Sequence, residues 1–256
     1  MDKEGKYIYC IIETKQERNF GPVVMGGKDN EVQTIGYDDL SMVVSTHSIG
    51  KLTVNEENML THEKVIEKVM KEFDSVLPVR FGSIAASSDE VRNLLDRRHR
   101  EFKSLLRDMD HKLELGVKGM WKDMDIIFRE IVKEDKDISN AKKDIEKDER
   151  KKNIHAKTKI GKMVEQRLIA KKQREAGKIL DALRRTAVEW KLNKTFGDEM
   201  FMNAAFLVTK GREKEFDNIM DDLSDEYNNR IKFKYTGPLP VFNFATTTIY
   251  PEEWEI

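Results

Sequence analysis

The stretch SVLPVRFGSIAASSDEVRNLL, Ser75–Leu95, joins a short apolar run to a capped helix. Pro78 has no N–H for a sheet ladder, so it is tolerated only at a sheet edge, a strand start or a bulge. Gly82 permits the positive φ that a tight turn needs. The S-x-x-E pattern of Ser87–Glu90 is a capping box, and it predicts that a helix begins there. The stretch therefore reads as strand, kink, turn and helix.

Arg80 stands between Val79 and Phe81 inside this apolar run. A charge at such a position is costly to bury without a partner. Two interpretations stay open at this point. In one, Arg80 crosses to a helix carboxylate and supports the fold. In the other, it contacts another molecule. The spacing favours the structural interpretation.

The composition limits the classes of function. The chain has 256 residues, enough for one large or two small domains. Its net charge of −1 argues against bulk attraction to polyanions. The single cysteine, Cys10, excludes an internal disulfide framework and a multi-cysteine zinc site, and it suits a reducing cytosol. The first ten residues have no apolar run typical of a signal peptide, and no stretch is apolar enough to span a bilayer.

Strands and helices alternate on both sides of a charged middle. Residue patterns predict strands at 6–12, on both sides of a turn at Tyr37–Asp39, at 111–121, at 200–209 and at 230–237. They predict helices over Thr53–Phe73, with a capping box from Thr53 to Glu56, over 87–106 as one helix, and over 211–229.

The middle of the chain, from Lys133 to Lys178, consists mainly of Lys, Glu, Asp and Arg and has no proline. We expect one or two long solvated helices, paired as a hairpin and continuing through Val188 and Trp190. The predicted elements around this segment follow the order strand, helical segment, strand, helix and strand. This order is close to a split β-α-β arrangement of the ferredoxin-like type.

The predicted fold class is α+β with two domains. The N-terminal α+β domain is expected to cover 1–111. The C-terminal domain is expected to cover 112–256 and to be a modified ferredoxin-like domain, with a long charged helical insertion over 133–195.

No constellation of catalytic, cofactor-binding or metal-ligating residues is found in the sequence, so no such site is predicted. The glycine-rich stretch Gly21–Asn30 lacks the spacing and the Ser/Thr of a phosphate loop. His62 and Glu63 lack the second histidine of a zinc-binding helix, and we expect His62 to contact the next strand. Asp38 and Asp39 are better explained as turn residues than as a carboxylate pair.

A basic run, Arg150–Arg174, raises the alternative of a ferredoxin-like RNA-binding module. The run contains no aromatic residue on which bases could stack, and acidic residues crowd just upstream of it. We therefore favour a solvated helix with mixed ion pairs, and we expect no nucleic acid as a partner.

The tail TGPLPVFNF, Thr236–Phe244, carries two prolines and several large apolar side chains. Either this tail folds back over a sheet, or it forms an apolar patch for a partner. The sequence does not choose between the two.

Motifs along nearly the whole chain resemble one known family. LPVRFG resembles the L-P-V-R-F-G signature of the gas vesicle protein F / gas vesicle protein L family (GvpF/GvpL), and YTGPLPVFNFA resembles its closing motif Y-T-G-P-W-P-P-Y-S-F. YIYCII, LSMVVSTH, His62–Glu63, LELGVKGMW and NAAFLVTKGREKEFDNIMDDL match in order and spacing. The tail departs from the motif at Leu239, Val241, Phe242 and Asn243.

The resemblance implies a non-enzymatic accessory or minor structural protein of gas vesicles in the cytoplasm. Its implied partners are the small, hydrophobic shell protein and other accessory proteins, with no cofactor and no lipid membrane. The family's fold is implied to be two α+β domains, the second ferredoxin-like. The candidate interaction or motif residues are Pro78, Arg80, Phe81, Gly82, Gly237, Pro238, Leu239, Pro240, Phe242 and Phe244.

Overall fold

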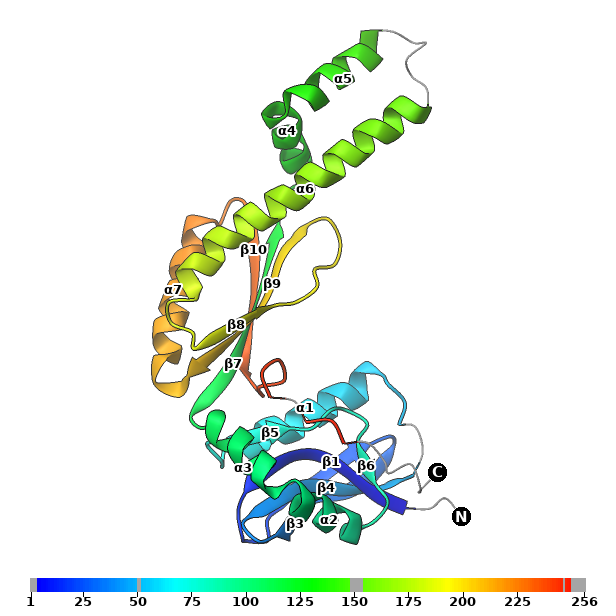
Figure 1. Cartoon of the computed structure of the whole chain (residues 1–256), viewed down its shortest axis with the longest axis vertical. Coiled ribbons are helices and arrows are strands. Elements are labelled where there is room, and N and C mark those ends of the chain that lie inside the picture. The colour runs from blue at the N-terminus through cyan, green and yellow to red at the C-terminus, as the bar shows by residue number, and fades with distance from the viewer. Residues whose placement is uncertain (1–3, 50–51, 148–153, 246, 250–256) are drawn as a thin grey trace. The chain divides into compact units, whose positions relative to one another are not determined.

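The computed structural model describes residues 4–49, 52–147, 154–245 and 247–249. By its contacts, the chain divides into two compact units: unit 1 is Met1–Glu114 with Pro238–Ile256, and unit 2 is Leu115–Gly237. The chain enters unit 2 within strand β7 (Lys112–Trp121) and leaves it within β10 (Ile231–Leu239) (Figure 1). The first crossing is close to the expected boundary at 111. The tail, in contrast, belongs to unit 1, because its residues pack against the first sheet.

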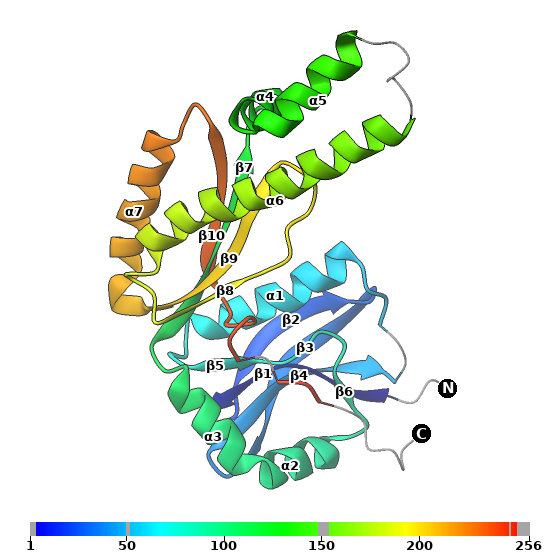
Figure 2. The same cartoon turned by 45° about the horizontal axis from the view of Figure 1, so that its top comes forward.

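Unit 1 is an antiparallel sheet with helices on both faces. Its strands are β1 (Glu4–Glu13), β2 (Asn19–Met25), β3 (Lys28–Tyr37), β4 (Leu40–Ser48), β5 (Val76–Pro78) and β6 (Ile84–Ala85). Its helices are α1 (Glu56–Met70), α2 (Ser88–Arg97) and α3 (His99–Asp108). The strand order is β2-β3-β4-β1-β5, and β6 also pairs with β1. Figure 2 shows α1 above this sheet and α2 and α3 below it.

Strand β1 forms the centre of the first core. All of its residues from Tyr7 to Ile12 are buried, although alternate side chains point to opposite faces. The helices on the two faces explain this continuous burial. The predicted strand at 6–12 and the predicted turn at Tyr37–Asp39 are confirmed.

The opening stretch has the predicted local structure. Pro78 ends the short edge strand β5, opposite Cys10, and Gly82 has φ +86°. Ser87 caps α2 by accepting a hydrogen bond from the Glu90 N–H at 3.1 Å. The single helix expected over 87–106 is wrong, because Arg98 interrupts it. The break lets α2 pack on β3 and β4 and α3 pack on β1 and β5.

Helix α1 is shorter than predicted. It begins after Asn55, whose side chain accepts a hydrogen bond from the Asn58 N–H at 2.8 Å, so Asn55 and not Thr53 is the N-cap. The Thr53 carbonyl instead accepts a hydrogen bond from the Asn58 side chain, at 2.9 Å. Val54 therefore lies outside the helix and is 73% exposed.

Unit 2 is a four-stranded sheet, in the order β10-β7-β9-β8, packed against helices. Its remaining elements are α4 (Met124–Glu134), α5 (Lys136–Lys147), α6 (Ile154–Leu183), β8 (Glu189–Leu192), β9 (Met200–Thr209) and α7 (Glu213–Glu226), with a short 3-10 turn at Lys210–Arg212 before α7. Helix α6 runs along the sheet and contacts β9 and α7 (Figures 1 and 2).

Ring contacts hold the second core together. Phe206 of β9 lies 5.2 Å from Phe216 of α7, and Trp121 stacks on Phe201 at 5.2 Å, both measured between ring centroids. A Cβ at Gly119 would approach the Phe201 ring to 2.6 Å, so the strand pair requires glycine there.

Two expectations for unit 2 are corrected. The helical segment expected over 133–195 contains a strand: α6 ends at Leu183, and β8 pairs with β9. The reason is the period-two alternation of apolar Val188, Trp190 and Leu192, which fits a strand and not a helix. Strand β10 also continues through Pro238 to Leu239, two residues beyond the predicted strand at 230–237.

Candidate functional site

The backbone of the LPVRFG turn binds the returning tail. The Arg80 N–H donates to the Thr247 carbonyl at 2.9 Å, and the Thr247 N–H donates to the Pro78 carbonyl at 3.0 Å. Val79 and Thr247 thus form a parallel bridge. On the other side of the turn, the Arg80 carbonyl accepts a hydrogen bond from the Ser83 hydroxyl at 2.8 Å. The motif is therefore fixed mainly through main-chain groups.

His62 connects helix α1 to this turn. Its Nδ1 lies 2.9 Å from the Tyr7 hydroxyl, and its Nε2 lies 3.1 Å from the Val79 carbonyl. A carbonyl only accepts, so Nε2 carries the hydrogen and Nδ1 accepts from Tyr7. The Tyr7 oxygen in turn accepts from the Gly82 N–H at 3.2 Å. The prediction that His62 contacts the next strand is confirmed.

Burial shifts the titration of this cluster. Removal from water lowers the pKa of His62 to about 4, although its hydrogen bond to the Val79 carbonyl opposes the shift. Burial also raises the pKa of Tyr7 above its usual value, and it raises the pKa of Tyr9 to about 12. The three rings are neutral near pH 7, as an apolar packing centre requires.

The tail folds back over unit 1, which decides the question that the sequence left open. Pro240 and Val241 are buried, and the Phe242 ring packs 6.2 Å from the His62 ring. The Asn243 N–H and side-chain amide donate to the two carboxylate oxygens of buried Glu114, at 2.8 and 2.5 Å.

The structure brings part of the predicted site together. Phe81 and Phe242 pack against the His62 ring, and Pro78 lies next to the Val79–Thr247 bridge. Phe244, two residues after Phe242, is half-buried. Gly237 and Pro238 are exposed and Leu239 is half-buried, all within the last residues of β10. Pro240 is buried.

Arg80 projects outward. Its side chain is exposed, and among the described residues no carboxylate forms an ion pair with it. The crossing to a helix carboxylate that the spacing favoured is thus not present in the described part of the chain. Gly82 is exposed as well, and Phe81 is half-buried.

An apolar groove that the sequence did not reveal lies between β2 and α1. Its volume is about 340 Å³. Buried Phe20, Val32 and Val65 contribute to its lining, and Val24 is 53% exposed at its side. The polar residues lining it are Glu57, Thr61, Lys64 and Lys68. The neighbouring β2 edge carries Pro22 and a bulge next to Gly21, two features that discourage strand pairing.

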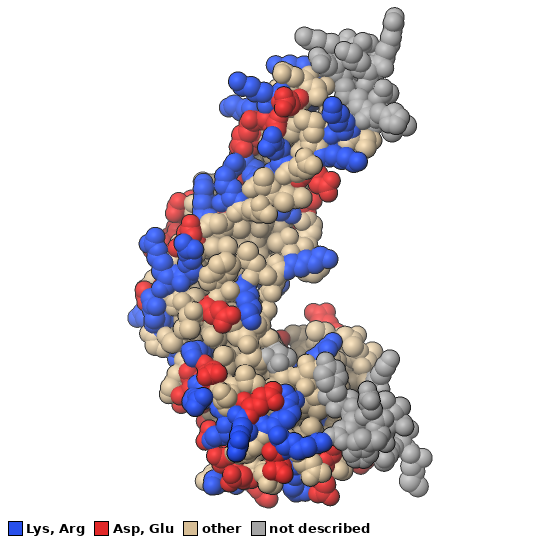
Figure 3. All heavy atoms as spheres, viewed as in Figure 1, with Lys and Arg blue, Asp and Glu red and all other residues tan. Residues whose placement is uncertain are grey.

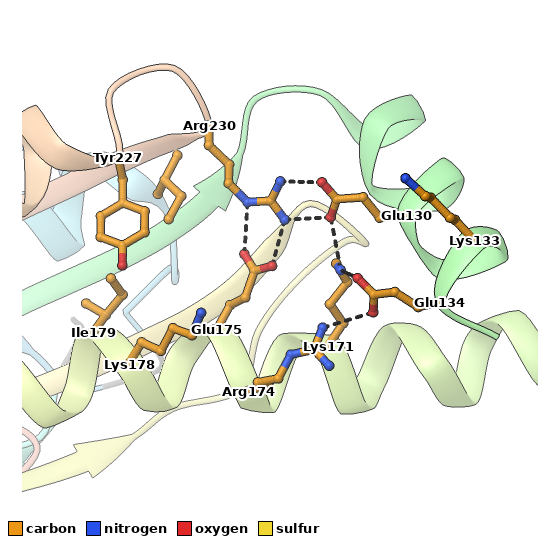
Figure 4. A pocket seen from close by; sticks show the side chains of 11 residues that line it. Glu130, Lys133, Glu134, Lys171, Arg174, Glu175, Lys178, Ile179, Tyr227 and Arg230 are labelled. Atoms are coloured by element: carbon orange, nitrogen blue, oxygen red, sulfur yellow. Dashed lines mark hydrogen bonds and ion pairs between the residues drawn. The ribbon is translucent and has the colours of Figure 1, made fainter.

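A pocket of about 660 Å³ in unit 2 is lined by a charged network (Figure 4). The Arg230 guanidinium donates two hydrogen bonds to Glu130, at 2.7 and 2.8 Å, and another to Glu175 at 2.7 Å. Lys171, only 4% exposed in its side chain, pairs with Glu130 at 2.9 Å and with Glu134 at 2.8 Å. The hydrogen bonds from Arg230, and those from Lys171, lower the pKa of Glu130 to about 2. The network joins α4, α6 and the start of β10.

Three cations of the basic run form ion pairs within the described residues. Arg167 forms an ion pair with Asp135, Lys171 pairs with two glutamates, and Arg174 pairs with Glu134 at 3.1 Å. Figure 3 shows acidic and basic side chains intermixed over α4, α5 and α6. The prediction of mixed ion pairs is confirmed for these cations. Residues 150–153 lie outside the described part of the chain.

Asp38, Asp39 and His99 place one ligand-type atom each within 4.8 Å of one another. All three groups already have partners: His99 Nε2 lies 2.8 Å from Asp39, and the Lys103 ammonium lies 2.9 Å from the same carboxylate. Asp38 lies 3.7 Å from the Lys15 ammonium. The hydrogen bond from Lys103 is the main reason why the pKa of Asp39 lies below its usual value. This arrangement is a surface ion-pair network that orients the β3–β4 turn against α3.

The geometry defines a class of protein: two α+β units, the first of which is completed by a C-terminal tail bound to an LPVRFG turn. Among the described residues, no helix is both long and apolar enough to cross a membrane. The family model described as "Gas vesicle synthesis protein GvpL/GvpF" matches residues 5–246. The chain therefore belongs to the GvpF/GvpL family of gas vesicle proteins, as its motifs predicted.

Similar proteins support this assignment. Gas vesicle protein F1 of Halobacterium salinarum is 25% identical over 252 residues, covering 98% of this chain and 97% of that protein. Gas vesicle protein F of Microcystis aeruginosa is 26% identical, with 94% and 98% covered. The crystal structure of GvpF from Anabaena sp. PCC7120 superposes with a TM-score of 0.79 at 22% identity, covering 95% of this chain and 99% of that chain. The chain thus has a GvpF-like α+β fold with two sheets.

Proposed function

We propose that this chain is a non-enzymatic accessory protein of gas vesicles, and that it binds the small hydrophobic shell protein and other accessory proteins during vesicle assembly in the cytoplasm. The observation that carries the proposal is the family match, which spans both units. Neither a nucleic acid nor a lipid membrane is part of this role. Unit 2, with its element order β-α-β-β-α-β, supports the interpretation of a modified ferredoxin-like domain.

The groove between β2 and α1 is the surface we assign to the shell protein. An apolar segment of a partner gains free energy when it leaves water for an apolar groove, and such grooves commonly accept apolar helix faces. The lining of buried Phe20, Val32 and Val65 supplies the apolar contact, and Lys64 and Lys68 keep the free surface soluble.

The exposed part of the LPVRFG turn is the surface we assign to other accessory proteins. Arg80 and Gly82 are exposed and Phe81 is half-buried. A partner can therefore reach the guanidinium of Arg80, the backbone of Gly82 and part of the Phe81 ring. Phe242, which the sequence offered as a binding residue, is assigned to holding the tail on His62.

Co-expression with the small shell protein tests the role. The full chain carries an affinity tag, and the soluble shell protein that it retains is measured. Val24→Lys places a charge in the groove and should reduce retention strongly. Val54→Lys, the same change at a more exposed position of unit 1, should not. Absence of retention by the folded wild-type chain, or equal retention by both variants, would contradict the proposal.

A further inference from the structure

Strand β8 is an edge strand with an exposed apolar face. It lies at one end of the strand order of unit 2, and all four of its residues are exposed. Trp190 and Leu192 are 39% and 54% exposed, and Val188, just before the strand, is 58% exposed. Because side chains alternate along a strand, Trp190 and Leu192 lie on one face. Val188 stands outside this alternation, because its N–H bonds to the Leu207 carbonyl of β9 at 2.8 Å. An apolar edge of this kind is a template for pairing with another strand.

The opposite face of β8 carries one charge of each sign. Glu189 and Lys191 are two residues apart, and their charged atoms lie 3.7 Å apart within the strand. Both side chains are about half exposed, at 53% and 45%. The strand therefore presents alternating charge and apolar character, with its two charges placed symmetrically about Trp190.

A hydrogen bond next to β8 shows which backbone groups of this strand point toward β9 and which point toward the free edge. The Asn193 N–H donates to the Asn203 carbonyl at 2.7 Å, and Asn203 is the next partner in the β8–β9 register. In an antiparallel ladder, the groups that face one neighbour alternate along the strand. Glu189 and Lys191 thus direct their backbone groups toward β9, and Trp190 and Leu192 direct theirs toward the free edge.

We propose that β8 pairs antiparallel with β8 of a second copy of this chain, across a twofold axis at Trp190, and so forms a homodimer. The outward N–H and C=O of Trp190 then bond to those of its counterpart. In the same register Glu189 faces Lys191 of the second copy, and Lys191 faces Glu189. The interface is isologous, as a twofold dimer requires.

The charges select this register over its neighbours. Shifting the pairing by two residues sets Trp190 opposite Leu192 and places the two Lys191 side chains directly opposite each other. Like charges at opposed positions destabilise a strand pair, whereas opposite charges stabilise it. A further shift, with Leu192 on the axis, moves Glu189 and Lys191 beyond each other's reach. The dimer goes beyond the proposed function, since it does not depend on which other proteins the chain binds.

Sedimentation velocity of the full chain tests the dimer over a wide range of protein concentration. The wild-type chain should show a concentration-dependent monomer–dimer equilibrium. Glu189→Lys or Lys191→Glu alone creates two like-charged pairs and should weaken dimerisation by about tenfold or more. An equimolar mixture of the two single variants should restore it, because the positive strand of one faces the negative strand of the other.

Two further variants complete the experiment. The double variant with both changes should dimerise like the wild type. Asp222→Lys makes the same change in charge at an exposed position of α7 and should leave the dimer intact. A wild-type chain that is monomeric throughout would overturn the proposal. It would equally be overturned by single variants that dimerise normally, or by a mixture that stays monomeric.

Discussion

The Tyr7 hydroxyl lies 2.9 Å from Nδ1 of His62, and its oxygen accepts a hydrogen bond from the Gly82 N–H. One tyrosine oxygen therefore connects the central strand β1, helix α1 and the LPVRFG turn. The contact is buried and both rings are neutral, so its strength depends on His62 remaining unprotonated.

Acid should weaken unit 1 through His62. The folded pKa of about 4 lies below the reference value of 6.5, so the unfolded chain binds the proton first as the pH falls. The contribution is fully present above pH 6.5 and is lost progressively toward about pH 4. Its total is about 3 kcal/mol, at about 1.4 kcal/mol for each pKa unit.

Urea unfolding at a series of pH values measures this effect. Carboxylates titrate in part of the same window, so the informative quantity is the difference between the wild type and His62→Gln, which has no titratable ring. The slope of unfolding free energy against pH between 4 and 6.5 should be smaller in the variant. Identical slopes would mean that His62 does not titrate abnormally.

Substitution of alanine for glycine should have opposite effects at two positions. Gly82 has φ +86° and Gly161 lies in α6, and neither would bring a Cβ within 4 Å of a neighbour. Gly82→Ala should lower the free energy of unfolding by about 1–2 kcal/mol through backbone strain alone. Gly161→Ala should raise it by about 0.5–1 kcal/mol, since alanine favours the helix. Thermal unfolding of both variants gives the sign, and the same sign for both would refute the backbone explanation.

Replacing Arg230 by lysine should destabilise unit 2 although the charge is kept. Lysine cannot reproduce the paired hydrogen bonds to Glu130 and the bond to Glu175. The expected loss is about 1–2 kcal/mol, because the network is partly exposed. Arg184→Lys, on an exposed pair with Asp181, should change stability by less than about 0.5 kcal/mol. Denaturant unfolding compares the two, and equal effects would show that the network adds nothing specific.

Arg80→Ala should leave the stability of the chain within about 0.5 kcal/mol of the wild type, because the side chain is exposed. Its binding to other accessory proteins should fall. The two measurements are a thermal melt and a pull-down with each accessory protein. A large drop in melting temperature would restore the structural interpretation of Arg80 and remove it from the proposed surface.

Phe242→Ala should destabilise unit 1 by about 1–2 kcal/mol, less than the loss for a fully buried ring, because Phe242 is only partly buried against the first core. Phe196→Ala makes the same change at a ring that is 65% exposed and should be nearly neutral. Chemical unfolding distinguishes them. A neutral Phe242→Ala would mean that the Phe242 ring does not help to hold the tail.

Local rules predicted much of the fold. Pro78 at a sheet edge, Gly82 with positive φ and the Ser87 cap each follow from the chemistry of one residue and its neighbours. Strand β8 was missed because its pattern has only four residues and follows a long helix without a proline or glycine boundary. The alternation of apolar and charged residues is present in the sequence, but it is too short to outweigh the helical context.

The less predictable features depend on distant pairs. Arg230 meets Glu130 and Glu175 across separations of 100 and 55 residues, which no local pattern encodes. The groove between β2 and α1 arises from the way one helix lies on one sheet. The fold-back of the tail depends on the carboxylate of Glu114 and on the backbone of Pro78 and Arg80, whose partners lie more than a hundred residues later in the chain.

Unit 2 is inserted into unit 1, which the chain leaves within β7 and rejoins within β10, and this order has a consequence for synthesis. The ribosome begins unit 1 first but releases its last piece only after all of unit 2 has been made. Until Thr247 emerges, Pro78 and Arg80 lack the backbone partners that the finished protein gives them. A chain that ends before Thr247 therefore carries an incomplete LPVRFG turn, and the turn is finished only once Thr247 has been added.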